Sequence, residues 1–264
     1  MKNHKTLFVG LSVAAVCLAG PLTRSYAQDD VEFSRKGVEL AKNKKYGEAA
    51  EEFSKAIKAN PKAPRHYSNR GKAYRAAGKL NEAVADFTKL IELEPDEAEG
   101  YRERGKVKGS LKDYDGGIAD LSKALEIGED LDAYRFRAFA YLSKNDFEKA
   151  VEDYTSVLEE KAGDPQALER RAFAYRSMKK FDEAIADYTK LIEKSPKDAE
   201  AFRNRGYAYA LSGDHVKAEE DYEKVLKIKP GDADAETRLK AAKAKATAAG
   251  GAPAPAPGAS PPAP

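Results

Sequence analysis

A basic side chain recurs along the chain at a step of 33 or 34 residues, and an acidic side chain stands sixteen residues after each one. Guanidinium and ammonium groups form charge-assisted hydrogen bonds with carboxylates, so this spacing predicts a repeated ion pair between neighbouring elements. We expect a structural role for the pairs, with ligand binding as the alternative. The six pairs are Lys36 with Glu52, Arg70 with Asp86, Arg104 with Asp120, Arg137 with Asp153, Arg171 with Asp187, and Arg205 with Asp221.

Residues that usually perform catalysis or bind metals are scarce in this chain. Beyond residue 27 the histidines are His66 and His215, and the single cysteine is Cys17. His215 occupies a column that the other repeats fill with Tyr, Leu or Phe, so we interpret it as a packing ring. The sequence has no glycine-rich phosphate loop, no nucleophile elbow and no HExxH motif. It therefore predicts no catalytic residue, no metal site and no cofactor.

Two amphipathic helices per repeat would position the charged columns. Residues 65–77 and 81–93 carry apolar side chains every three to four positions, with Gly78 at the turn between them and Pro95 at the exit. The same pattern predicts six helical hairpins and a further helix, which would cover the apolar edge of the last hairpin as terminal caps of solenoids do. The predicted hairpins span about residues 30–63, 64–97, 98–130, 131–164, 165–198 and 199–232, and the capping helix spans residues 234–248.

Two columns of small residues keep the same step, and aromatic residues accompany them. Small residues let two helices approach closely and aromatic rings fill the space beside them, so we expect these columns to form the core. One column contains Ala49, Ala83, Gly117, Ala150, Ala184 and Ala218, and the other contains Gly37, Gly71, Gly105, Ala138, Ala172 and Gly206. The aromatic residues are Phe53, Phe87, Tyr154, Tyr188 and Tyr222 after the first column, and Tyr74, Tyr141, Tyr175 and Tyr209 after the second.

Together with the prolines that close four of the units, these columns resemble the tetratricopeptide repeat. The prolines are Pro61, Pro95, Pro196 and Pro230. The resemblance covers roughly residues 30–232 and depends on six units that keep register together. It implies an all-α fold, a right-handed superhelical solenoid of tetratricopeptide helix-turn-helix repeats with a C-terminal capping helix.

The third unit departs most from this pattern. It is one residue short, has Lys108 and Gly109 where a tyrosine and its neighbour belong, and has Glu129 in place of the closing proline. Glycine within a helix costs up to about 1 kcal/mol relative to alanine. We therefore predict that the array is locally weakest between residues 105 and 131.

The resemblance also implies a binding surface, because in proteins of this family the first helices line a concave groove that accepts an extended peptide or a partner helix. Carried over from the family pattern, the inward positions make this groove basic, with an aromatic strip toward its second half. They are Lys72, Arg75, Arg102, Lys106, Arg135, Phe139, Leu142, Phe173, Arg176, Arg203 and Tyr207.

The residue types in this predicted groove favour a particular ligand. Arginines bind carboxylates through bidentate hydrogen bonds, and aromatic faces hold apolar or proline side chains. We therefore expect other proteins as partners, bound through acidic, partly apolar peptide segments. The alternative is that the arginines pair with acids such as Glu99, Glu103 and Glu169 on neighbouring turns and only solvate the surface.

Residues 1–27 have the order of a secretory signal peptide. Lys2 and Lys5 precede an apolar run, and Ser25 and Ala27 provide the small residues that signal peptidase reads. We expect export to the bacterial periplasm or secretion, with membrane contact only through the transient signal peptide. An uncleaved anchor is the alternative, although about 15 apolar residues fall short of the ~20 that a spanning helix requires.

The charge of the chain depends on this segment. Of 46 basic and 44 acidic side chains, loss of residues 1–27 removes three basic ones and leaves 43 against 44. Nucleic-acid binding relies on a concentrated positive surface, so we expect no nucleic-acid partner. Loss of Cys17 with this segment leaves no thiol and therefore excludes a disulfide framework. Residues 250–264, which follow the repeat region of residues 28–249, alternate Ala and Pro and are expected to be disordered.

These patterns favour a protein–protein interaction scaffold or adaptor of the cell envelope, and they argue against an enzyme. The alternative is a structural component that self-associates through the open faces of its end repeats. The sequence does not determine the oligomeric state.

Overall fold

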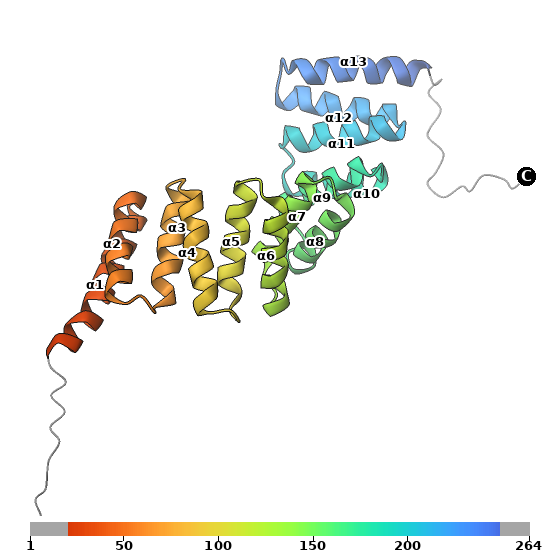
Figure 1. The fold of residues 1–264 in the computed structure, drawn as a ribbon. Coiled ribbons are helices and arrows are strands. Elements are labelled where there is room, and N and C mark those ends of the chain that lie inside the picture. The colour runs from red at the N-terminus through yellow and green to blue at the C-terminus, as the bar shows by residue number, and fades with distance from the viewer. Residues whose placement is uncertain (1–20, 249–264) are drawn as a thin grey trace, which may run out of the picture. The chain divides into compact units, whose positions relative to one another are not determined.

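The computed structural model describes residues 21–248, and these residues form thirteen α-helices and no strand (Figure 1). This result confirms the prediction of an all-α fold. The helices are α1 (Pro21–Lys42), α2 (Tyr46–Ala59), α3 (Pro64–Ala76), α4 (Leu80–Leu93), α5 (Ala98–Ser110), α6 (Tyr114–Ile127), α7 (Leu131–Ser143), α8 (Phe147–Glu160), α9 (Pro165–Ser177), α10 (Phe181–Lys194), α11 (Ala199–Ser212), α12 (His215–Ile228) and α13 (Ala233–Ala248).

The chain divides into two compact units, which are described separately. Of the described residues, 21–79 belong to unit 1, which contains α1, α2 and α3, with α2 packed against both other helices. Described residues 80–248 belong to unit 2, and each of its helices from α4 to α12 packs against the next one in the chain. Unit 2 is therefore a solenoid of helical hairpins, and α13 packs against α12 at its end (Figure 1).

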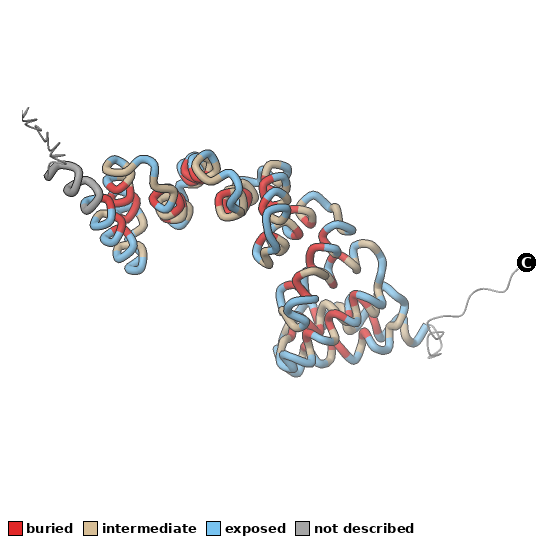
Figure 2. Tube along the Cα trace, turned by 90° about the horizontal axis from the view of Figure 1, so that it is seen from below, coloured by how far each residue is buried: buried red, intermediate tan, exposed pale blue. Residues whose placement is uncertain are grey.

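The predicted small and aromatic columns form the core at these helix contacts. Ala150, Ala184 and Ala218 are fully buried, and the rings of Tyr188 and Tyr222 beside them are almost fully buried. Buried positions follow the helix faces that meet a neighbour, while exposed positions cover the opposite faces (Figure 2). The narrow apolar stripes of the sequence thus become the contacts between successive helices.

The turn inside each predicted hairpin contains one residue with positive φ, at the same place in every repeat. The prediction of a turn at Gly78 is confirmed. Residues other than glycine lose roughly 1–2 kcal/mol in this conformation, so helix packing imposes the turn geometry even where the sequence does not favour it. The six residues and their φ angles are Lys44 (60°), Gly78 (76°), Lys112 (64°), Asn145 (60°), Lys179 (62°) and Gly213 (93°).

In the third repeat, two glycines bring α5 and α6 close together. A Cβ atom on Gly105 would lie 2.7 Å from Leu121 Cγ and 3.1 Å from the carbonyl oxygen of Gly117. Helix α6 is nevertheless complete, because the Asp113 carboxylate caps it by accepting a hydrogen bond from the Gly116 amide at 3.0 Å. Packing therefore requires Gly105 and Gly117, and the local weakness of this repeat stays a prediction.

Gly109→Ala is expected to raise the free energy of unfolding by about 0.5–1 kcal/mol. A Cβ atom at Gly109 would meet no atom within 4 Å, and alanine is the better helix former. The matched change on the same helix, Gly105→Ala, should lower the free energy of unfolding by about 1–3 kcal/mol because its Cβ is crowded. Urea unfolding followed by circular dichroism measures both changes. Shifts of the same sign would contradict the prediction.

Candidate functional site

Five of the six predicted ion pairs have both members within one unit, and in all five the side chains meet. Four arginines each form two hydrogen bonds with the carboxylate sixteen residues later, as Arg171 does with Asp187 at 2.8 Å for both bonds. The prediction of a repeated ion pair is therefore confirmed. The shortest N to O distances are 3.0 Å for Lys36–Glu52, 2.7 Å for Arg104–Asp120, 2.6 Å for Arg137–Asp153, 2.8 Å for Arg171–Asp187 and 2.8 Å for Arg205–Asp221.

These four arginines, and Arg70 as well, also donate a hydrogen bond to a hydroxyl group in the preceding repeat. Arg171 Nη1, for example, donates to Thr155 Oγ1 on α8 at 2.9 Å. Each of these arginines therefore ties together two successive repeats, which the sequence reading missed although a hydroxyl residue recurs at a step of 33 or 34 residues. The arginine and hydroxyl pairs are Arg70 with Ser54, Arg104 with Thr88, Arg137 with Ser122, Arg171 with Thr155, and Arg205 with Thr189.

The four arginines Arg104, Arg137, Arg171 and Arg205, with their carboxylate and hydroxyl partners, form what we call the ladder. Burial of these side chains shows that the ladder has a structural role. The Asp187 side chain is 3% exposed and the Arg171 side chain is 14% exposed, so the pair is largely removed from solvent. Burial alone would lower the pKa of Arg171, but the hydrogen bonds to Asp187 outweigh it and raise that pKa. The Lys36 side chain in unit 1 is 57% exposed, so its pair contributes less than the arginine pairs.

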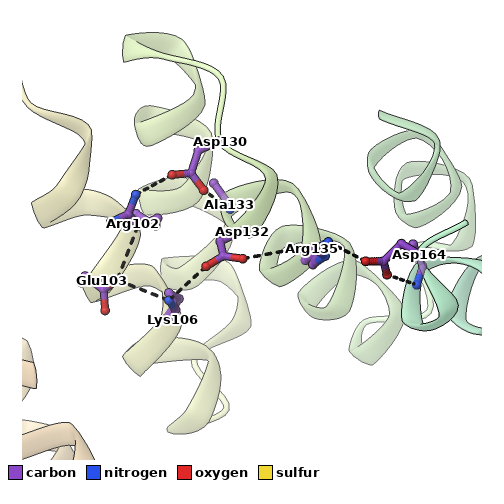
Figure 3. A network of polar contacts seen from close by, with 9 residues as sticks. Arg102, Glu103, Lys106, Asp130, Asp132, Ala133, Arg135 and Asp164 are labelled. Atoms are coloured by element: carbon purple, nitrogen blue, oxygen red, sulfur yellow. Dashed lines mark hydrogen bonds and ion pairs between the residues drawn. The ribbon is translucent and has the colours of Figure 1, made fainter. Parts of the chain in front are cut away.

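The predicted groove residues divide between the two units. Lys72 and Arg75 lie on α3 in unit 1, and the other nine lie on α5, α7, α9 and α11 in unit 2. Within unit 2, three of the predicted groove arginines have the same kind of partner, an aspartate at the start of the helix that opens the next repeat or, for Arg203, of α13. Figure 3 shows the first two of these pairs. The pairs are Arg102 with Asp130 at 2.5 Å, Arg135 with Asp164 at 2.6 Å, and Arg203 with Asp232 at 2.5 Å.

These aspartates also cap the helices that they begin. The second carboxylate oxygen of Asp130 accepts a hydrogen bond from the Ala133 amide at 2.9 Å, and Asp164 and Asp232 do the same for their helices. The alternative expectation, that the arginines pair with acids, therefore holds for Arg102, Arg135 and Arg203. Glu103, one of the acids named above, also lies 3.4 Å from Arg102.

Two further predicted groove residues are already engaged by the fold. Lys106 Nζ lies 3.3 Å from Glu103 and 3.8 Å from Asp132 (Figure 3). The same Nζ lies 4.7 Å from the centre of the Phe136 ring. Leu142 contradicts its prediction, because it is buried in the core instead of facing a groove. The Leu142 side chain lies in one core cluster with Tyr154 of α8, where burial removes its apolar surface from water.

Three predicted aromatic residues form an exposed row, which we call the aromatic strip: Phe139 on α7, Phe173 on α9 and Tyr207 on α11. These three residues are 41%, 41% and 36% exposed, and each directly follows the small residue of its helix. Guanidinium groups lie over the rings. Arg170 is 5.7 Å from the Phe139 centroid, and Arg176 is 5.5 Å from Phe173 and 5.0 Å from Tyr207.

Arg170 and Arg176 differ from the other arginines of this surface because neither forms an ion pair with any residue in the range 21–248. Arg176 donates a hydrogen bond to the Asn204 side chain at 3.2 Å. Glu169 is exposed and occupies the column that holds arginine in three other repeats, so the local excess of positive charge is small. The strip can thus bind an apolar group beside a carboxylate. The sequence reading missed Arg170, which lies outside the family's inward positions.

Unit 1 contains a buried polar cluster that the sequence did not indicate. Asp30 is 2% exposed, and His66 is fully buried. Asp30 Oδ2 accepts hydrogen bonds from His66 Nε2 at 3.0 Å and Asn60 Nδ2 at 3.1 Å, with Arg65 at 3.4 Å. Burial opposes ionisation, but these donors outweigh it and lower the pKa of Asp30. The cluster joins α1 to α3 within unit 1.

Residues 21–248 contain neither a cluster of metal ligands nor a candidate membrane span. Within residues 21–248, no three potential metal ligands gather at one place. In the same range, no helix combines the length and the apolar character needed to cross a bilayer. The predicted signal peptide lies largely outside the described residues, and the Ala/Pro tail lies wholly outside them.

Asp130→Asn is expected to make the stability of unit 2 less dependent on pH below about pH 4. Burial would raise the pKa of Asp130, but the Ala133 amide and Arg102 outweigh it and hold that pKa below its ordinary 3.8. A carboxylate with a lowered folded-state pKa stabilises the fold above its unfolded-state pKa, and this contribution is lost as pH falls through the folded value. Urea unfolding at a series of pH values measures the slope.

Two other carboxyl groups, those of Asp153 and Asp221, change stability with pH in the opposite direction. The pH dependence must therefore be compared between variants that differ at a single aspartate. Burial raises the pKa of Asp153 and of Asp221 beyond the lowering by their arginines. These groups therefore bind protons more readily in the folded state and offset part of the acid sensitivity. The exposed Asp96→Asn is the control and should leave the slope unchanged. An unchanged slope in Asp130→Asn would contradict the prediction.

Comparison with known families and structures gave a consistent result. Residues 35–98, 68–132 and 169–233 match the tetratricopeptide repeat, and residues 131–164 match a second description of the same repeat. No curated protein matched the sequence.

Solved structures with a similar fold include those of YrrB, MamA and pilF. "Crystal structure of YrrB: a TPR protein with an unusual peptide-binding site" is 26% identical, covers 72% of this chain and 99% of that chain, and has a TM-score of 0.66. "Crystal structure of MamA" is 26% identical, covers 62% of this chain and 96% of that chain, and has a TM-score of 0.58. The Pseudomonas aeruginosa pilF structure is 12% identical, covers 84% and 99%, has a TM-score of 0.64 and shows the fold alone.

Proposed function

Because the chain belongs to the tetratricopeptide repeat family, whose members serve as scaffolds for protein–protein interaction, we propose that it is an adaptor of the cell envelope that binds a peptide segment of a partner protein. The proposed binding surface is the aromatic strip of unit 2 with Arg170 and Arg176. The preferred ligand is an acidic, partly apolar peptide.

The observation that carries this proposal is the pairing of exposed rings with guanidinium groups that lack an acidic partner in the described residues. Arg102, Arg135 and Arg203 are neutralised by aspartates and hold the fold together. Arg170 and Arg176 retain their charge for a ligand and stand over Phe139, Phe173 and Tyr207. A peptide carboxylate there would gain charge-assisted hydrogen bonds while its apolar neighbours cover the rings. The similar protein YrrB is described as having a peptide-binding site, which supports a peptide as the ligand.

The test is selection from a random peptide library displayed on phage, with the full chain as bait. The expected peptides combine Asp or Glu with apolar residues. Arg170→Glu with Arg176→Glu should reduce their recovery at least about tenfold, as expected from loss of a charged hydrogen-bonded pair. The control makes the same charge change on exposed second-helix residues, Lys190→Glu with Lys224→Glu. Recovery of no peptides, or equal recovery with both variants, would reject this surface.

The envelope part of the proposal is supported by the signal-like order of residues 1–27. Mass analysis of the protein's N-terminus, after expression in a bacterium and separation of periplasm from cytoplasm, tests it. A periplasmic chain that begins at Gln28 is expected. A chain that retains Met1 in the cytoplasm would contradict export.

A second candidate function, self-association, is favoured by the exposed apolar surface of α1. Val31 is 50% exposed and Val38 is 37% exposed, and these residues border a surface depression of about 500 Å³ in unit 1 that also includes Arg65. Sedimentation equilibrium over a range of concentrations separates the two functions. A monomer at every concentration would reject self-association.

A further inference from the structure

A pocket of about 90 Å³ opens between α5 and α7 in unit 2, next to the aromatic strip. Its floor is buried, since Leu121 is 1% exposed and Ala140 is 2% exposed. Two rings on α7, Phe136 and Phe139, border it and reach the surface. The residues around it include Gly105, Gly109, Leu121, Phe136, Phe139 and Ala140.

The pocket exists because the third repeat lacks a side chain at Gly109. A Cβ atom there would meet nothing within 4 Å, so the space beside it is open. The equivalent position of the next repeat, 33 residues later, holds Leu142, which is buried with Tyr154 and Ala174 in a core cluster. The repeat itself therefore shows that a leucine side chain fits this place.

The size and lining of the pocket suit an aliphatic group. A single water needs about 10–15 Å³ of such volume, so the pocket of about 90 Å³ can hold several methyl-sized groups. Apolar walls bind such a group by removing its surface from water. The cation at the rim, Lys106, is paired with Glu103 and Asp132, so it adds no free charge to the pocket.

The charge beside the pocket specifies the rest of the ligand. Phe139 borders the pocket, and the Arg170 guanidinium lies 5.7 Å from the centroid of the same ring without an ion pair in residues 21–248. When an aliphatic side chain of a peptide occupies the pocket, an acidic residue two or three positions away in that peptide would therefore lie near Arg170. An extended chain advances about 3.3 Å per residue.

We propose that this pocket is the anchor site for a leucine-sized aliphatic side chain of the partner peptide, with an acidic residue two or three positions away. The inference rests on the proposed function and adds the residue that gives the peptide its register. Gly109 is then a specificity residue of the third repeat, because any larger side chain would fill the anchor site from within.

The experiment repeats the phage selection on the wild-type chain and on Gly109→Leu, which supplies the side chain that the next repeat has. Gly47→Leu on α2 is the matched control, because a Cβ atom at Gly47 also meets nothing within 4 Å. Gly109→Met fills the same space with a more flexible side chain and serves if Gly109→Leu fails to fold. Circular dichroism and the urea midpoint report folding.

Wild type and Gly47→Leu are expected to select an aliphatic residue at a fixed distance from Asp or Glu, while Gly109→Leu keeps the acidic preference only. Changing the aliphatic residue of one selected peptide to Ala should weaken binding to wild type about tenfold or more and leave binding to Gly109→Leu unchanged. The same aliphatic preference in Gly109→Leu would overturn the anchor site while the groove stands. Recovery of no peptides by wild type would overturn both proposals.

Discussion

Asp187→Ala is expected to lower the free energy of unfolding of unit 2 by about 3–5 kcal/mol. The substitution leaves Arg171, whose side chain is only 14% exposed, with a single hydrogen bond to Thr155. A charge that is removed from water without its partner is among the most costly defects in a folded protein. Urea unfolding followed by circular dichroism measures the loss, and the exposed Glu193→Ala on the same helix should change stability by less than about 0.5 kcal/mol.

A double-mutant cycle separates loss of the pair from loss of the individual side chains. Arg171→Met with Asp187→Leu removes both charges and keeps apolar volume, so the double variant should be more stable than the sum of its single changes predicts. Additive effects would show that the two side chains do not depend on each other, and the ladder would then have no energetic role.

Asp30→Ala is expected to lower the stability of unit 1 by about 3 kcal/mol, because it strips the acceptor from three donors in a buried cluster. His66 is fully buried, and Asp30 is the one hydrogen-bond partner that its ring has among the described residues. Since α1 and α3 are joined through this carboxylate, α1 should separate first. Hydrogen exchange of the amides of α1 should accelerate, while those of α8 to α12 stay protected.

Asp29→Ala is the control for this change, since Asp29 adjoins Asp30 in the chain and is exposed. It should leave hydrogen exchange unchanged. Equal acceleration in Asp29→Ala, or no acceleration in Asp30→Ala, would show that the cluster does not hold α1. The lowered pKa of Asp30 adds a second signature, because its contribution is present above its ordinary pKa and fades as pH falls through the lowered value.

Features that recur in every repeat could be predicted from the sequence. The ion-pair column was visible because residues sixteen apart in two antiparallel helices return to the same level, and six copies exclude coincidence. The small and aromatic columns indicated the core for the same reason. The hydroxyl partners, Thr155 among them, carry an equally regular signal, but they lie in the preceding repeat and only the structure brings them to Arg171.

Two kinds of feature could not be predicted: contacts that no period marks, and contacts whose partner lies in the following repeat. The pairing of Asp30 with His66 joins residues 36 apart in one place only. Arg102, Arg135 and Arg203 were predicted to face a ligand, but each pairs with a helix-capping aspartate of the following repeat, which the spacing within one helix does not reveal. Leu142 was assigned to the surface by analogy with the family, and local packing against α8 buries it.

Each arginine of the ladder takes its carboxylate from its own repeat and its hydroxyl from the repeat before it, as Arg171 does with Asp187 and Thr155. A gene duplication that copies one whole repeat brings one arginine, one acid and one hydroxyl, so the inserted segment forms the same bonds at both junctions. A duplication of half a repeat would strand a desolvated charge. The length of the array can therefore evolve readily in whole repeats and only at high cost in fractions of one.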